Sequence, residues 1–219
     1  MKEGDFIRID YIGRIKESGQ IFDLTDEKLA KEKGMYNPNV SYRPVPVIIG
    51  GDFVIKGLEA ELKKMKVGEK KRFSVKPEDA FGQRTPKLIK LIPMSEFYKR
   101  NMVPYQGMSV TINNLMGRVL SVSGGRVRVD FNHPLAGKEL EYDLEIKEKI
   151  TNKKEKVEAV IEFFYKPVKK QDVSFEGKTV EIKFESKADV PKQSKEKIAN
   201  TILKWIKNVE KVRFVEEYT

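Results

Sequence analysis

The chain has 219 residues with a formal net charge of +10, and 39% of them are hydrophobic and 35% charged. This length and apolar content suit one large domain or two to three small ones with real cores. The absence of cysteine excludes disulfides and thiol chemistry. No apolar run is long enough to span a bilayer and no signal peptide precedes the first residues, so we expect a cytoplasmic protein.

The first third of the chain contains several segments that alternate between polar and apolar residues and one longer stretch of helical spacing around residue 58. The predicted elements are strands at 5–15 and 21–23, a short helix at 29–33, an extended segment at 44–49, a helix at 54–65 and a strand at 70–76. In the second helix the apolar residues Val54, Ile55, Leu58, Leu62 and Met65 recur at helical spacing. Because a lone helix among strands buries its apolar side against the sheet, we predict an α+β fold with an antiparallel sheet wrapped around one short helix.

The middle of the chain reads as a small β-rich unit. We predict an extended connector at 86–93, a helix at 95–100 and strands at 108–112, 117–122 and 126–131, with hairpin turns at 113–114 and 123–125. The alternating strand at 139–146 would complete the first sheet, which makes this unit an insertion in a loop. Residues 147–156 are charged and would form a linker or extend the ribbon.

The last third reads as β-β-α-β, a small C-terminal α+β domain. We predict a strand at 157–165, a hairpin of 172–175 with 179–184, a helix opening at Pro191 and a closing strand at 209–215. Ile198, Ile202, Trp205 and Ile206 share one side of the helix. A unit this short has a small core, so it relies either on the rest of the chain or on a second copy.

The sequence contains few signals of catalytic chemistry. It has no phosphate-binding glycine loop, no HExxH, no GxSxG and no CxxC. The single histidine, His133, lies between Asn132 and Pro134, and we interpret it as a turn residue rather than a base. We expect no cofactor and no metal site. An aromatic and aliphatic set in the first domain remains, and from the residues alone it reads as an ordinary hydrophobic core.

An ordered series of short motifs gives this set another interpretation. Tyr11-Ile12-Gly13, Phe22-Asp23, Ile49-Gly50, the segment 54–59, the segment 65–69 and Ala80-Phe81-Gly82 resemble the FKBP-type peptidyl-prolyl isomerases over residues 1–83. Residues 132–140 resemble the SlyD branch, in which a chaperone domain is inserted in the flap, and the whole resembles long archaeal members with an extra C-terminal domain. The implied domains are the isomerase at 1–86 and 132–150, the insert at 87–131, and the C-terminal domain at 155–219.

The resemblance implies a proline-binding pocket and a surface for unfolded clients. The pocket residues would be Tyr11, Phe22, Asp23, Val54, Ile55, Leu58, Phe81, Leu135 and Tyr142. The client-binding residues would be Met94, Phe97, Tyr98, Met102, Val103, Met108, Leu115 and Met116, because flexible thioethers suit promiscuous surfaces. Leu58 departs from the family, which often has tryptophan at the pocket floor. The histidine-rich metal tail of SlyD is absent, so nickel handling is not implied.

We therefore expect a peptidyl-prolyl isomerase with chaperone activity that acts on unfolded polypeptides containing X–Pro bonds. One alternative is a non-catalytic holdase on the same scaffold, and another is a ribosome- or RNA-associated adaptor that uses the basic surface. The lysines are spread along the chain, which favours a solvated surface over a nucleic-acid partner. For the C-terminal domain we expect either homodimerisation or additional client contact.

Overall fold

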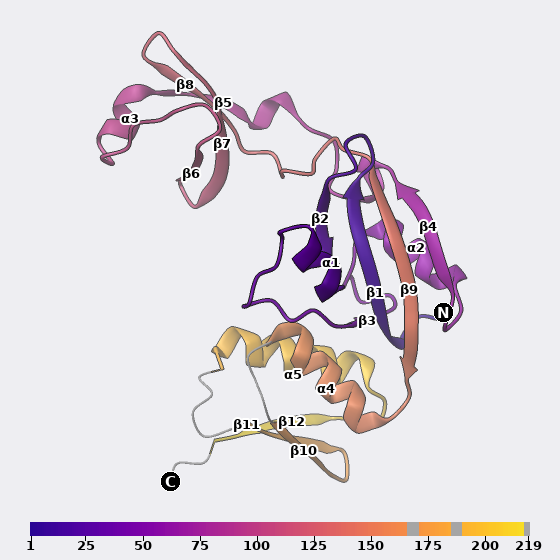
Figure 1. The fold of residues 1–219 in the computed structure, drawn as a ribbon. Coiled ribbons are helices and arrows are strands. Elements are labelled where there is room, and N and C mark those ends of the chain that lie inside the picture. Colours follow the sequence, from indigo (N-terminus) through magenta and orange to yellow (C-terminus); the bar gives the residue numbers. More distant parts are fainter. Residues whose placement is uncertain (166–170, 185–189, 217–219) are drawn as a thin grey trace. The chain divides into compact units, whose positions relative to one another are not determined.

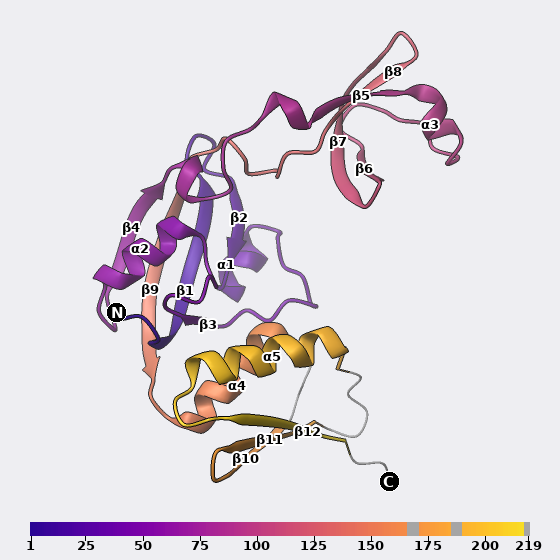
Figure 2. The same cartoon turned by 180° about the vertical axis from the view of Figure 1, so that it is seen from behind.

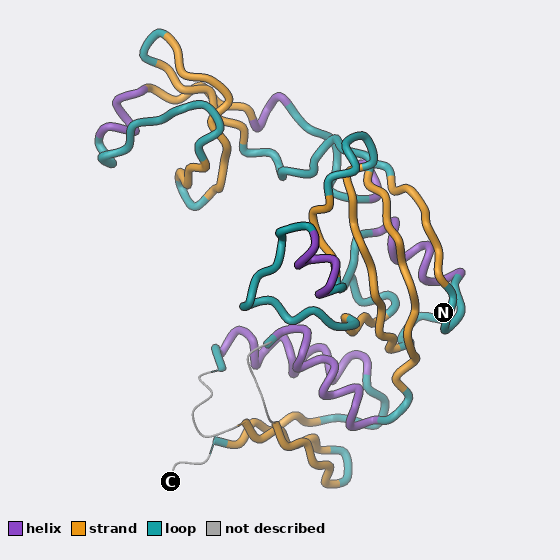
Figure 3. Tube along the Cα trace, in the orientation of Figure 1, coloured by secondary structure: helices purple, strands orange, loops and turns teal. Residues whose placement is uncertain are grey.

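The computed structural model describes residues 1–165, 171–184 and 190–216, and its chain divides into two compact units. The first unit joins Met1–Ser74 to Glu141–Thr219, and the second is Val75–Leu140. Both units combine antiparallel sheets with short helices (Figures 1 and 3), which confirms the predicted α+β class. No helix in the described ranges is long and apolar enough to cross a membrane.

The first unit is built on a five-stranded sheet. Its strands are β1 (Phe6–Ile15), β2 (Ile21–Leu24), β3 (Val45–Ile48), β4 (Lys70–Val75) and β9 (Leu140–Ile150), in the order β2-β1-β9-β4 with β3 also paired to β1. Strand β1 runs antiparallel to both of its short partners, with Ile12 opposite Leu24 and Phe6 opposite Ile48. The segment 139–146 therefore closes the first sheet, as predicted, and β9 continues to Ile150.

Helix α2 (Lys56–Lys64) lies against one face of this sheet (Figures 1 and 2). It buries Leu58 and Leu62, and Met65 is buried just beyond its end. The alternating strands supply the other half of this core, with residues such as Ile9 and Ile146 fully buried. A shorter helix, α1 (Glu27–Glu32), begins where the Asp26 side chain accepts a hydrogen bond from the Leu29 N–H.

The second unit is a four-stranded antiparallel sheet with one helix. Its elements are β5 (Ile89–Pro93), α3 (Met94–Tyr98), β6 (Ser109–Ile112), β7 (Leu115–Ser123) and β8 (Arg126–Asp130), and the strand order is β5-β8-β7-β6. Of the predicted extended connector at 86–93, Pro86–Leu88 form a short 3-10 helix instead, whereas Ile89–Pro93 are extended and also pair with β8 as an edge strand. The turn Asn113-Asn114 has positive φ at both residues, as a two-residue hairpin requires.

The C-terminal part of the first unit has the order α4 (Lys153–Phe164), β10 (Gln171–Glu176), β11 (Thr179–Phe184), α5 (Lys192–Trp205) and β12 (Lys211–Val215). The hairpin, the helix and the closing strand confirm the prediction, and β12 runs parallel to β11. The predicted strand at 157–165 is wrong, because these residues form most of α4. The Asn152 side chain starts that helix by accepting hydrogen bonds from the Lys154 and Glu155 N–H groups.

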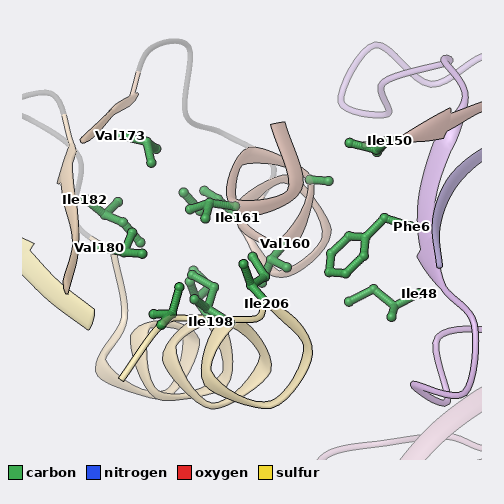
Figure 4. Packing of buried hydrophobic residues seen from close by; sticks show 14 of the residues in the cluster. Phe6, Ile48, Ile150, Val160, Ile161, Val173, Val180, Ile182, Ile198 and Ile206 are labelled. Atoms are coloured by element: carbon green, nitrogen blue, oxygen red, sulfur yellow. The ribbon is translucent and has the colours of Figure 1, made fainter. Parts of the chain in front are cut away.

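A single hydrophobic cluster connects this C-terminal part to the first sheet (Figure 4). Phe6, Ile48 and Ile150 point from the sheet toward α4 and α5, and the opposite side of the cluster comes from Val180 and Ile182. The Phe53 ring extends the connection, since its centroid lies 4.3 Å from Phe163 and 5.9 Å from Phe164. The small C-terminal core therefore relies on the rest of the chain, one of the two alternatives that its length left open.

Candidate active site

Four of the predicted pocket residues meet on strands β1, β2 and β9 of the first unit. The ring centroids of Tyr11 and Tyr142 lie 6.2 Å apart, and the Phe22 ring meets Tyr142 edge-on at 5.9 Å. The Tyr11 hydroxyl donates a hydrogen bond of 2.7 Å to Oδ2 of Asp23. These contacts make an aromatic cluster with one carboxylate at its edge, because Tyr142 is buried while Asp23 is exposed.

Gly13 makes the close packing of these rings possible. A Cβ atom at this position would lie 2.6 Å from the Phe22 ring, closer than real Cβ contacts, and 3.0 Å from the Tyr142 ring, tighter than most of them. Strand β1 therefore needs a residue without a side chain at this point, which explains the glycine in the Tyr11-Ile12-Gly13 motif.

The electrostatics keep both tyrosines protonated. Burial raises the pKa of Tyr11 well above 10, and the negative charge of Asp23 and its hydrogen bond raise it further. Burial also raises the pKa of Tyr142, again with help from Asp23. Both hydroxyls are therefore donors across the physiological pH range, and they can orient groups by hydrogen bonding without exchanging protons.

Three further predicted residues lie at the start of helix α2. Ile55 is the residue that precedes the first helical turn, and its carbonyl accepts a hydrogen bond from the Glu59 N–H at 3.1 Å. Val54 and Ile55 are half-buried, whereas Leu58 is buried in the core beneath the helix. The accessible apolar surface here therefore comes from Val54 and Ile55, because Leu58 is only 3% exposed.

The remaining two predicted pocket residues belong to the second unit. The Phe81 ring stacks on His133 with centroids 4.2 Å apart and nearly parallel planes, and Leu135 is half-buried. Nδ1 of His133 accepts a hydrogen bond from the Leu135 N–H at 3.2 Å. This bond supports the interpretation of His133 as a turn residue, and the stack gives the imidazole a second role in holding the Phe81 ring.

Phe73 is a member of the aromatic cluster that sequence reasoning missed. Its ring on β4 stacks on Tyr142 with centroids 6.2 Å apart and planes 21° from parallel. The available signal was the alternation of residues 70–76, which places Phe73 on the same side of its strand as the buried Val75. The motifs that resemble the family do not include Phe73, so the predicted pocket had no residue from β4.

The predicted client-binding residues divide into two groups. Phe97 is only 1% exposed and belongs to the core of the second unit, so its prediction as a client-binding residue is wrong. Met94, Met102 and Met108 are half-buried and pack against that same core. Four residues remain well exposed, at 58% to 75% of their surface: Tyr98, Val103, Leu115 and Met116. These four are the part of the set that a client can reach.

A cavity of about 570 Å³ in the first unit has a different character from the aromatic cluster. It shares Tyr11 with that cluster, and its lining includes Ile12 and Tyr42 but also several charged residues that are already paired. Asp143, for example, accepts hydrogen bonds from Arg14 at 2.5 Å and from Arg72 at 2.5 and 2.9 Å. Such a surface does not suit a proline ring, and within the described ranges no three acidic or histidine side chains gather as a metal site.

Comparison with known proteins decides the family. The model described as FKBP-type peptidyl-prolyl cis-trans isomerase matches residues 1–97, and models described as FKBP26, IF domain and FKBP26_C-terminal match residues 90–135 and 153–219. The short-type peptidyl-prolyl cis-trans isomerase of Methanocaldococcus jannaschii is 34% identical over 148 residues, which are 68% of this chain and 93% of that protein. The chain belongs to the FKBP-type peptidyl-prolyl cis-trans isomerases.

Bacterial members of the family are similar over a shorter part of the chain. A probable FKBP-type 16 kDa isomerase of Pseudomonas fluorescens is 39% identical over 108 residues, 47% of this chain and 71% of that protein. The FKBP-type isomerase SlyD of Helicobacter pylori is 33% identical over 113 residues, 49% of this chain and 60% of that protein. The similarity to SlyD confirms the resemblance that residues 132–140 indicated.

Membership in the FKBP-type isomerases explains why the site holds so few charged groups. The protein is a peptidyl-prolyl cis-trans isomerase, and its reaction is rotation about an X–Pro bond, with no bond broken. Amide resonance opposes this rotation with a barrier of about 18–20 kcal/mol. An enzyme lowers it by binding the twisted state more tightly than either planar state, which apolar walls and a few fixed donors can do.

Proposed function

We propose that this isomerase accelerates the proline-limited folding of polypeptides and captures its clients on the inserted domain. The isomerase domain comprises residues 1–86 and 132–150, the insert 87–131, and the C-terminal domain 155–219. The clients are unfolded or partly folded chains that contain X–Pro bonds. The observation that carries the proposal is the aromatic cluster of Tyr11, Phe22 and Tyr142, with Asp23 fixed at its edge.

In the proposed mechanism the proline ring is held among apolar side chains while the imide twists. The pocket residues are Tyr11, Phe22, Asp23, Val54, Ile55, Leu58, Phe81, Leu135 and Tyr142. The twisted imide has lost its resonance and is less polar than the planar form, so transfer from water to an apolar wall favours it. Asp23 and Tyr11 orient the pocket through their hydrogen bond, and no proton is transferred.

Exposed apolar side chains on the second unit support the proposed chaperone activity. Val103 and Met116 are 74% and 75% exposed, in a unit whose core is already filled by Phe97 and four valines. Exposed apolar side chains mark an interaction surface where they adjoin one another, as Leu115 and Met116 do at the start of β7. Binding a client there raises its local concentration near the isomerase site, which increases catalysis on long chains but adds nothing for short peptides.

The test compares two substrates: a proline-containing tetrapeptide in a protease-free assay and a protein whose refolding is limited by proline isomerisation. The variant Val103→Ser/Leu115→Ser/Met116→Ser should lower the ratio of refolding catalysis to tetrapeptide turnover by about tenfold. The control, Val67→Ser/Leu203→Ser, alters exposed apolar residues of the first unit and should leave this ratio unchanged. An equal ratio in both variants contradicts client capture on the insert.

The pocket assignment has its own test, independent of the insert. Replacing Phe22 or Tyr142 with alanine should reduce turnover of the tetrapeptide and of the refolding protein by the same factor. Unchanged turnover in both variants contradicts the pocket, whereas an effect confined to the refolding protein assigns these residues to client binding.

We also propose partners for the C-terminal domain and for the basic surface. We propose a homodimer through the C-terminal domain, and a cytoplasmic location near ribosomes. The mass of the full chain in solution, measured over a range of concentrations, tests the homodimer. The full chain is needed, because removing α4 and α5 would expose Phe6, Ile48 and Ile150 of the first sheet.

A further inference from the structure

Three exposed arginines share the outer face of the second unit's sheet. In β8, Val127 and Val129 point into the core and are fully buried, so Arg126 and Arg128 point the other way and are exposed. In β7, Arg118 lies directly opposite Asp130 and shares its face, and this arginine is exposed too. We call this the arginine face, defined by Arg118, Arg126 and Arg128.

Pairing register also places apolar side chains on the arginine face, and two of them are large and well exposed. Leu91 of β5 lies opposite Arg128, and Met116 of β7 is two residues before Arg118 on the same strand. Leu91 is 63% exposed and Met116 75% exposed. Ser109, Ser121 and Ser123 lie directly opposite Arg118, Arg128 and Arg126, and all three arginines are exposed.

The charge on this face is not neutralised within the described chain. Asp130 is its only carboxylate, and it is already occupied: Arg84 binds Oδ2 at 2.6 Å, and Asn132 donates to Oδ1 from its backbone and its side chain. Among the described residues, no carboxylate forms an ion pair with Arg118, Arg126 or Arg128. From residue 87 to 131 seven lysines and arginines stand against two carboxylates, Glu96 and Asp130, and Glu96 is bound to Lys99.

We propose that the arginine face binds acidic segments of client polypeptides. The proposal rests on client capture by the insert and adds the chemical class of client that the insert prefers. Guanidinium groups bind carboxylates in a fixed two-pronged geometry, and Leu91 and Met116 offer apolar contact between these charges. An extended acidic chain with interspersed apolar residues complements such a face in charge and in polarity.

A polypeptide fits this face better than a single-stranded nucleic acid does. Sheets that bind single strands stack bases on aromatic side chains of the exposed face. The described residues that pairing register places on this face are arginines, serines, Thr111, Asp130 and aliphatic residues, and none is aromatic. The exposed rings of Tyr98 and Tyr105 belong to α3 and to the loop after it. The face therefore has the cations that nucleic acids require but lacks the stacking platform.

The experiment measures binding of the full-length protein to two fluorescent peptides without proline. They share the same apolar residues, and one carries glutamates where the other carries lysines. We expect about tenfold tighter binding of the acidic peptide at about 0.1 M salt and loss of this preference near 1 M, where the screening length falls from about 10 to about 3 Å. The variant Arg118→Gln/Arg126→Gln/Arg128→Gln should remove about tenfold of the affinity for the acidic peptide.

A matched variant with the same loss of charge controls for a general electrostatic effect. Lys87→Gln/Lys90→Gln/Arg100→Gln alters exposed cations elsewhere on the second unit and should leave the preference intact. If both variants weaken acidic binding equally, long-range charge is responsible and the arginine face is not a site.

The remaining outcomes separate this inference from the function on which it rests. Binding of neither peptide by the unaltered protein overturns client capture and the inference together. Equal binding of both peptides leaves client capture standing and overturns the acidic preference. If oligouridine displaces the acidic peptide and binds more tightly through the same three arginines, the partner is a nucleic acid and the proposal is wrong.

Discussion

The hydrogen bond between Tyr11 and Asp23 is the most specific polar feature of the aromatic cluster. The carboxylate is exposed and its other lone pairs face solvent, while the half-buried tyrosine supplies the donor. The raised pKa values of Tyr11 and Tyr142 keep both phenols protonated throughout the range in which the enzyme is assayed. Isomerase activity should therefore show no tyrosine titration below pH 10.

Replacing Tyr11 with phenylalanine tests the orienting role. The ring contact with Tyr142 stays while the hydroxyl is lost, which removes about 0.5–1.5 kcal/mol of hydrogen-bond stabilisation. If the bond orients the pocket in the transition state, kcat/KM for a tetrapeptide should fall about two- to tenfold. Tyr105→Phe, at an exposed tyrosine of the second unit, is the control. A value unchanged in Tyr11→Phe would show that the hydroxyl is dispensable.

Asp143 on β9 gives the protein a stability that depends on pH. Hydrogen bonds from Arg72 and, against the effect of burial, from Arg14 hold the pKa of Asp143 below its ordinary 3.8. A lowered folded-state pKa stabilises the native state above the unfolded value, and this contribution is lost as the pH falls through the folded pKa. Asp143→Asn should therefore cost about 1 kcal/mol near pH 7, and this cost should shrink as the pH falls below 3.8 toward the folded-state pKa.

Urea unfolding of both proteins at several pH values measures this difference. The exposed Glu17→Gln is the matched control, and its free energy of unfolding should stay within about 0.5 kcal/mol of the unaltered protein. A difference for Asp143→Asn that persists at low pH would mean that the substitution acts through packing and not through charge.

The candidate site could be predicted only through family resemblance, and its chemistry explains why. Tyr11, Phe22 and Tyr142 obey the same alternation as core residues, so no pattern separates a pocket wall from a core. The resemblance found four residues that the structure brings together, but it omitted Phe73, which only the contact with Tyr142 reveals. Burial at a single position, as with Phe97, depends on neighbours distant in sequence and could not be read from the chain.

At the scale of elements, strands predicted from a long alternation of polar and apolar residues were correct, whereas the strand predicted from a short apolar run was wrong. Strands β1 and β9 alternate over their length, and their prediction was confirmed. Residues 157–165 are rich in valine, isoleucine and phenylalanine, a composition typical of strands, yet Val157, Val160 and Ile161 also have helical spacing and are all buried in α4. The decisive local signal was Asn152, a preferred residue for the start of a helix.

The substitution Asn152→Ala measures the strength of that signal. Its side chain accepts hydrogen bonds from Lys154 N at 2.8 Å and Glu155 N at 3.2 Å, and loss of such a cap costs about 1 kcal/mol. Asn152→Asp is the matched control, because a carboxylate caps equally well. Equal destabilisation by both substitutions, measured by urea unfolding, would assign the effect to something other than the cap.

At the scale of the whole molecule, the cluster of Phe6, Ile48 and Ile150 with α4 and α5 makes the C-terminal domain part of the isomerase unit. Because one core serves both parts, they should lose their structure in one cooperative transition. The exposed surface of such a domain is free for partners, while its inner surface is committed to the fold.

Phe6→Ala tests this shared core, because Phe6 is 1% exposed and belongs to β1 while its ring lies against the C-terminal helices (Figure 4). The cavity should cost about 3–5 kcal/mol. Hydrogen exchange should then accelerate together at the amides of Ile9 in β1 and of Ile202 in α5, since both exchange through the same opening. Phe175→Ala, at a partly exposed position of β10, is the control and should affect both amides little. Faster exchange at Ile9 with Ile202 unchanged would mean that the two parts unfold independently and that the shared core does not couple them.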